Sequence, residues 1–110
     1  MTAAQDFFIT MLIQRLKDRE LTVRIHAGVQ LGGMGVEAKP ALPALLQLRH
    51  SESVHDRRLA ALTLGMLCHE LPESVPPLQD ALHDEDEAVR RLAAEALKEI
   101  APAHKRLNAA

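Results

Sequence analysis

The chain has 110 residues and a formal net charge of −2 at pH 7, with 47% hydrophobic and 25% charged residues. This length fits a single domain, and the composition excludes a disordered chain. The charge excludes a strongly basic surface, so we expect no nucleic acid partner. The longest apolar run, residues 7–13, is too short to cross a bilayer, so we expect no membrane partner.

Apolar residues recur at three- and four-residue steps along the chain, which predicts amphipathic helices. Runs of β-branched residues, which favour strands, are absent. Pro43, Pro76 and Pro77 lie where helices are expected to begin and a missing N–H costs little. In chain order, we expect helices near residues 4–17, 21–33, 40–49, 54–69, 73–83 and 86–101, followed by a polar, frayed tail over residues 102–110.

The chain matches itself without gaps when it is shifted by 33 residues. A fixed period is typical of repeat architectures, in which helical hairpins stack on a shared core and about three hairpins are needed for stability. The period predicts one domain over residues 1–101, with repeats near residues 4–35, 36–69 and 70–101. Aligned columns include Arg24, Arg57 and Arg90; Ala27, Ala60 and Ala93; Leu31, Leu64 and Leu97; and Leu12, Leu45 and Leu78.

A sequence pattern accompanies this period: Leu-x-Asp, then Val-Arg, then two small residues, then Ala-Leu. The third unit carries it as Leu82-His83-Asp84, Val89-Arg90, Ala93-Ala94 and Ala96-Leu97, and the first as Leu16-Lys17-Asp18, Val23-Arg24, Ala27-Gly28 and Leu31-Gly32. In this pattern the chain resembles HEAT-like repeat proteins over roughly residues 5–101, including the short repeats of phycobilisome-lyase-type proteins. The resemblance implies an all-α fold, a right-handed α-solenoid of three HEAT-like helix–turn–helix repeats with the first helices outside and the second helices inside. Ankyrin and tetratricopeptide repeats share the period, but their signature residues are absent.

The resemblance also implies a ladder of ion pairs along the hairpin turns. Its members are Asp18 and Asp84 as carboxylates and Arg24, Arg57 and Arg90 as cations, and we interpret the ladder as structural. The second unit departs from the pattern, because Ser51 replaces the aspartate, Asp56 the valine and Arg49 the leucine. We therefore expect a rearranged turn in that unit, with Asp56 as the local partner of an arginine.

The six histidines do not predict a metal site. Zinc needs three or four converging ligands, and neither His-x-x-x-His nor Cys-x-x-Cys spacing occurs. His26 falls in a core column with Leu59 and Leu92, so we expect it to be partly buried. Cys68 and His69 are adjacent and would point about 100° apart on a helix, which disfavours a thiol nucleophile.

No other motif predicts catalysis. The stretch Gly32-Gly33-Met34-Gly35 is interpreted as a close-packing site and helix C-cap, because it ends a helix rather than opening one. We expect no enzymatic activity, no catalytic residue, no cofactor and no metal. The single cysteine and the lack of a recognisable signal peptide predict a cytoplasmic location.

The sequence predicts a non-catalytic protein–protein interaction module: a scaffold, adaptor or subunit. Two alternatives stay open, a small lyase-type or cofactor-handling protein and a structural segment that completes a larger helical array. On the second helices, apolar residues stand opposite the core stripe in the first two repeats, and charged residues do so in the third. The hypothesis is that a protein partner contacts Ile25, Val29, Leu62 and Met66, with Arg58 at the rim. Burial of these residues between repeats is the alternative.

The first helix is apolar around most of its circumference, which is typical of a buried helix. Packing within one chain can cover only part of that surface. We therefore predict self-association as a homodimer, or capping by a partner, through Phe7, Phe8, Met11 and Leu12. A monomer with scattered exposed apolar groups is the alternative.

Overall fold

The protein is described by a computed structural model that covers the backbone of residues 2–109 and the side chains of residues 2–100. Within residues 2–109 it consists of helices and connecting turns, with no strand. The α-helices are α1 (Ala3–Arg15), α2 (Leu21–Gly32), α3 (Leu42–Arg49), α4 (Val54–Leu67), α5 (Val75–Ala81) and α6 (Glu87–Ala109). Two short 3-10 helices, η1 (Gly35–Ala41) and η2 (Pro72–Ser74), precede α3 and α5.

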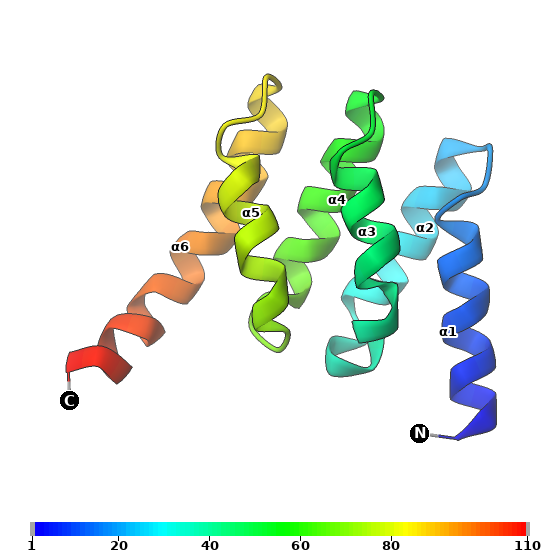
Figure 1. Ribbon diagram of the computed structural model, residues 1–110, viewed down its shortest axis with the longest axis horizontal. Coiled ribbons are helices and arrows are strands. Elements are labelled where there is room, and N and C mark those ends of the chain that lie inside the picture. Colours follow the sequence, from blue (N-terminus) through cyan, green and yellow to red (C-terminus); the bar gives the residue numbers. More distant parts are fainter. Residues whose placement is uncertain (1, 110) are drawn as a thin grey trace.

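These helices form three antiparallel hairpins that stack side by side (Figure 1). The first helices α1, α3 and α5 make one layer, and the second helices α2, α4 and α6 make the other. Helix α4 packs extensively on both α2 and α6, whereas α3 and α5 contact each other only weakly. The molecule is therefore an all-α solenoid, as predicted, and its continuous layer is that of the second helices.

The aligned apolar columns of the sequence contribute to the core. Leu12, Leu45 and Leu78, one from each first helix, are all fully buried. Small residues let the second helices approach closely. A Cβ atom added at Gly28 would lie 2.7 Å from Leu59 Cδ1, and one added at Gly65 would lie 3.0 Å from Ala96 Cβ. The glycines thus serve helix packing, and none of them opens a phosphate-binding loop.

Two boundaries differ from the prediction. The segment expected as one helix over residues 40–49 begins earlier, as the 3-10 helix Gly35–Ala41, and becomes α-helical only at Leu42. Its first residue, Gly35, has a φ of 63°, a conformation that favours glycine and allows the sharp exit from α2. The last helix, expected over residues 86–101, also ends later than predicted, because α6 continues to Ala109. Lys105, Arg106 and Leu107 are good helix formers, and polarity alone does not end a helix.

Candidate functional site

Two surfaces of the second helices bear on function, and the first is the edge that carries the hairpin turns. Here Arg24, Arg57 and Arg90 each fold back on the turn that precedes their helix. In every repeat the Nη1 group donates to two successive backbone carbonyls. The acceptors are Asp18 and Arg19 for Arg24, Ser51 and Glu52 for Arg57, and Asp84 and Glu85 for Arg90, at N···O distances of 2.7–3.1 Å.

The second turn is therefore bonded like the other two, and the expectation that it is rearranged is wrong. The acceptors are backbone carbonyls, so a change of side chain at Ser51 leaves these bonds intact. Helices α2, α4 and α6 also begin at equivalent positions, Leu21, Val54 and Glu87.

Carboxylates tie the first two of these arginines to the following repeat. Arg24 Nε lies 2.9 Å from Asp56 Oδ1, and Arg57 Nε lies 3.0 Å from Asp84 Oδ2. Arg49 joins the second pair, with its Nη1 at 3.2 Å from the same Asp84 oxygen. Arg90 has no carboxylate partner among the residues with described side chains. Asp56 thus pairs with an arginine, as expected, and this arginine belongs to the preceding repeat.

The Asp18 carboxylate lies outside this ladder, contrary to the prediction. Its Oδ1 accepts the backbone N–H of Glu20 at 2.9 Å, and only its carbonyl oxygen meets Arg24. The reason is that each ion pair joins an arginine of one repeat to a carboxylate of the next repeat along the chain. The first repeat has no described repeat before it, so Asp18 has no such arginine to bind.

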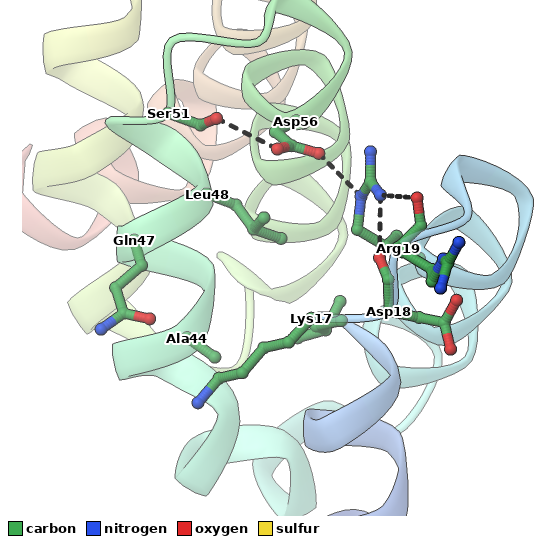
Figure 2. Close-up of a pocket in the computed structure, with 10 residues that line it drawn as sticks. Lys17, Asp18, Arg19, Ala44, Gln47, Leu48, Ser51 and Asp56 are labelled. Carbon is green, nitrogen blue, oxygen red and sulfur yellow. Dashed lines mark hydrogen bonds and ion pairs between the residues drawn. The ribbon is translucent and has the colours of Figure 1, made fainter.

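Asp84 performs two tasks that the second repeat divides between two residues. Its Oδ1 accepts the N–H of Asp86 at 2.9 Å, while Oδ2 binds Arg57. In the second repeat, Ser51 Oγ accepts the N–H of Ser53 at 3.1 Å, and Asp56 binds the arginine. Ser51 Oγ also donates to Asp56 Oδ2 at 3.0 Å, which joins the two halves (Figure 2).

These groups are shielded from water. The Asp84 side chain is only 5% exposed. Burial raises the pKa of Asp84, but the Asp86 amide, Arg57 and Arg49 outweigh burial and hold it below the ordinary value. The cleft beside the first two turns is lined by polar groups such as Lys17 and Gln47 and by the apolar Ala44 and Leu48 (Figure 2). Its Arg24 and Asp56 are bonded to each other. This edge is therefore committed to holding the repeats together.

The second surface is the side of α2, α4 and α6 that points away from the core, here called the second-helix face. Its positions are Ile25, Val29 and Gly33 on α2, Arg58, Leu62 and Met66 on α4, and Arg91, Glu95 and Glu99 on α6, and all nine are exposed. The four large apolar side chains, here called the apolar patch, are each exposed by 37–43%. Stacking therefore buries these four side chains only in part.

Two shallow hollows mark this face, and both are bounded by Leu62 and Leu92. The hollow nearer the turns also includes Ile25 and is almost wholly apolar. The hollow nearer the helix C-termini lies beside Met66 and is bordered by Glu95 and Glu99. Together they make a furrowed apolar surface with acid along one side.

Some of the charges around the patch, including Arg58 and Glu99, already contact a group of opposite or potentially opposite charge. Arg58 donates to both carboxylate oxygens of Asp86, at 2.9 and 2.8 Å, and this hydrogen bonding holds the pKa of Asp86 well below its usual value. His69 Nε2 lies 3.3 Å from Glu99 Oε2. Arg91 and Glu95 form no ion pair with any residue whose side chain is described. They remain free to meet a partner.

Comparison with known families decides the identity. A family model for HEAT repeats matches residues 9–98. The chain belongs to the HEAT repeat family. A search of curated proteins gives no match. HEAT repeats generally mediate protein–protein interactions, and the family is generally non-catalytic.

The N-terminal end of this HEAT solenoid is only partly apolar. On α1, Phe7 is 73% and Phe8 is 39% exposed, and Met11 is half-buried. Leu12 is fully buried, so its predicted role in self-association is wrong. The run of residues 7–13 is apolar on every side, and the pattern therefore gave no sign of which residues face the core.

His26 is exposed and not partly buried as expected. In the second and third HEAT repeats its column holds Leu59 and Leu92, and Leu59 is buried against the preceding repeat near Gly28. The first repeat has no described repeat to pack against, and it places His26 and the exposed Gln30 on this side of α2. This side of α2 is therefore polar.

Of the remaining candidates for chemistry, His50 and His83 line one cleft at the turn edge, and Cys68 is not part of that cleft. Among the described side chains, no group of three or more His, Cys, Asp or Glu residues could hold a metal ion. Cys68 is buried, its Sγ donates to the Gly65 carbonyl at 3.1 Å, and burial raises the pKa of its thiol. A raised pKa keeps the thiol protonated and unreactive. No described helix is long and apolar enough to span a membrane.

Proposed function

We propose that this HEAT solenoid is a non-catalytic interaction module, a scaffold, adaptor or subunit that binds a protein partner through the second-helix face. One observation carries the proposal. The first two repeats expose Ile25, Val29, Leu62 and Met66 at positions where the third repeat places charge. A solvated helix face needs charge there, and apolar residues gathered on one surface favour a protein contact.

Internal comparison of the repeats supports this choice. The core column of Leu12, Leu45 and Leu78 keeps its residue type, and so does the turn-edge column of Arg24, Arg57 and Arg90. Columns on the second-helix face change from apolar to charged along the chain. Side chains that stacking does not require are available for recognition.

The mechanism is presentation on a rigid support. Stacked helices hold the apolar patch in place, so binding orders few side chains of the module itself. Met66 is unbranched and adapts to the shape of a partner. Arg58 is held by its hydrogen bonds to Asp86. It forms the charged border of the patch on the side of the hairpin turns.

The two alternatives have less support. Cys68 and the histidines form no arrangement suited to lyase chemistry among the described side chains. If the chain completed a larger helical array, the next hairpin would have to pack against α6. Met66 lies against Gly32 and Ala96 against Gly65, but the exposed Lys98 occupies the equivalent position of α6. A further repeat stacked in the same geometry would meet that side chain.

The test compares one double variant with a matched control. Val29→Asp/Leu62→Asp places two charges in the apolar patch, and Leu46→Asp places a charge at a similarly exposed leucine of α3. After circular dichroism and melting establish that both variants are folded, each is used to capture partners from an extract of the source cells, with mass spectrometry as the readout. We expect Leu46→Asp to keep the partner and the double variant to lose it. A folded double variant that recovers the same partner at full yield removes this face as the binding site.

We also propose self-association through α1. The chain has only two aromatic residues, Phe7 and Phe8, and both are exposed on this helix. Light scattering at high micromolar concentration should detect a dimer that Phe8→Glu abolishes. A monomer in both cases contradicts the proposal.

A cytoplasmic location is a further part of the proposed function, supported by a buried cysteine that has no second cysteine to pair with.

A further inference from the structure

The charges beside the apolar patch change sign along α6. This order indicates which charges a partner protein needs in order to bind there. Helix α6 carries Arg91, Glu95 and Glu99 along one line of the second-helix face. Successive members are four residues apart, about 6 Å along the helix surface. The line therefore runs from one positive charge near the turns to two negative charges nearer the helix C-terminus.

On the opposite border of the patch, polar side chains of α2 share a hollow with Arg15 of α1. There α2 exposes Thr22, His26 and Gln30. The patch thus has an acidic border on α6 and a polar border, beside Arg15, on α2. A partner that lies over Val29, Leu62 and Met66 meets these two borders on its two flanks.

We infer that the occupant of the apolar patch is an amphipathic helix of a partner protein with a basic pair on one flank. This inference rests on the proposed function. The helix lays an apolar stripe at i, i+3, i+4 and i+7 against the patch, as helices do in apolar grooves. Its flank toward α6 carries Lys or Arg at i and i+4, spaced to meet Glu95 and Glu99.

Charge complementarity sets the direction of the partner helix as well as its composition. An acidic residue of that helix lies opposite Arg91, one turn away from its basic pair. The macrodipole of α6 adds to this order, because its N-terminal end is partly positive. A helix that runs the opposite way places like charges together and is disfavoured.

Three synthetic helical peptides of 18 residues provide the probe. All share one leucine stripe, and their α6-facing flank carries Lys, Glu or Gln at i and i+4. Titration calorimetry against the full chain at low salt should give an affinity for the Lys peptide about tenfold above that for the Glu peptide. The Gln peptide should lie between them, and added salt should narrow the differences.

Variants of the chain assign the effect to its residues. Glu95→Lys/Glu99→Lys should reverse the preference so that the Glu peptide binds more tightly. Glu52→Lys/Glu85→Lys makes the same change in net charge at exposed positions of the turn edge and should leave the preference as it was. Leu62→Asp, or Met66→Glu if the first variant is poorly folded, should abolish binding of all three peptides.

The outcomes separate this inference from the proposed function. If the three peptides bind equally, or if the turn-edge variant also reverses the preference, the basic helix is wrong as the occupant. If Leu62→Asp and Met66→Glu both leave peptide binding unchanged, the face itself is wrong and the proposed function falls with it. A chain dimer that Leu62→Asp dissociates would assign the patch to a second copy and overturn the inference.

Discussion

The turn edge and the second-helix face are formed by the same three helices, yet one follows the repeat and the other does not. At the turn edge, Arg24, Arg57 and Arg90 make equivalent hydrogen bonds in every repeat. On the second-helix face, the middle position changes from Val29 to Leu62 to Glu95. A repeat protein thus contains its own comparison, in which constant columns serve stacking and changing columns are free to serve recognition.

The two surfaces also differ in how their side chains meet water. Asp84, Arg49 and Arg57 lie with 5%, 10% and 17% of their side chains exposed, and Asp84 accepts a hydrogen bond from each of the two arginines. Side chains of the apolar patch are about 40% exposed and contact water in the free protein. Substitutions should therefore be costly at the turn edge and mild on the face.

The largest loss of stability is expected for Asp84→Ala. This change removes the carboxylate that binds Arg49 and Arg57. It also removes the hydrogen bond that the Asp84 carboxylate accepts from the Asp86 N–H. Breaking a buried pair by removing one partner costs about 3–5 kcal/mol. Urea denaturation should show this decrease in the free energy of unfolding, with the exposed Asp80→Ala as control. A loss equal to that of the control would show that the ladder does not hold the repeats together.

A smaller difference is expected between two equivalent arginines. Arg57 bonds to its own turn and to Asp84, whereas Arg90 bonds only to its own turn. Arg57→Ala also leaves a buried carboxylate partly unsatisfied, which costs about 1–3 kcal/mol, and Arg90→Ala should cost about 1 kcal/mol or less. Thermal melting of the two variants tests the order. Equal melting temperatures would count against a structural ladder.

Acid should weaken the same edge. Because the pKa of Asp84 is held below its ordinary value of 3.8 in the folded chain, its charge stabilises the fold above that pH. This contribution is lost as the pH falls through the lowered pKa. The free energy of unfolding should decrease between about pH 5 and pH 2, and Asp84→Asn should flatten that decrease. An unchanged slope in Asp84→Asn would assign acid sensitivity to other carboxylates, with Asp86 the next to test.

Much of the fold followed from the period. The aligned columns placed Leu45 and Leu64 in the core and Arg57 at the turn edge, because a 33-residue shift brings residues of one role together. The apolar patch was also predicted as a set of positions, since the helical period separates it from the core stripe. Its exposure was not predictable, because a periodic pattern does not say how closely neighbouring helices approach.

Where the prediction failed, the missing information was three-dimensional. The column of His26 indicates which side of α2 the residue occupies. It does not indicate whether another repeat packs against that side, and in the described structure none does. The division of the Asp84 roles between Ser51 and Asp56 depends on two side chains meeting across a turn. An alignment of the repeats compares single positions. It does not reveal that two residues of one repeat together make the interactions that a single residue makes in another.

The smallest effect is expected on the second-helix face, where two leucines of α4 provide a matched test. Leu62 is 37% exposed and Leu64 is fully buried, although they are two residues apart on one helix. Leu64→Ala should cost about 2–5 kcal/mol, because it removes core contacts and leaves a cavity. Leu62→Ala should cost less than about 1 kcal/mol, because its side chain already contacts water and alanine favours the helix. If both changes lower the free energy of unfolding equally, Leu62 serves packing like its neighbour and the apolar patch belongs to the core. If Leu62→Ala leaves stability intact but weakens partner binding, the patch is maintained for recognition.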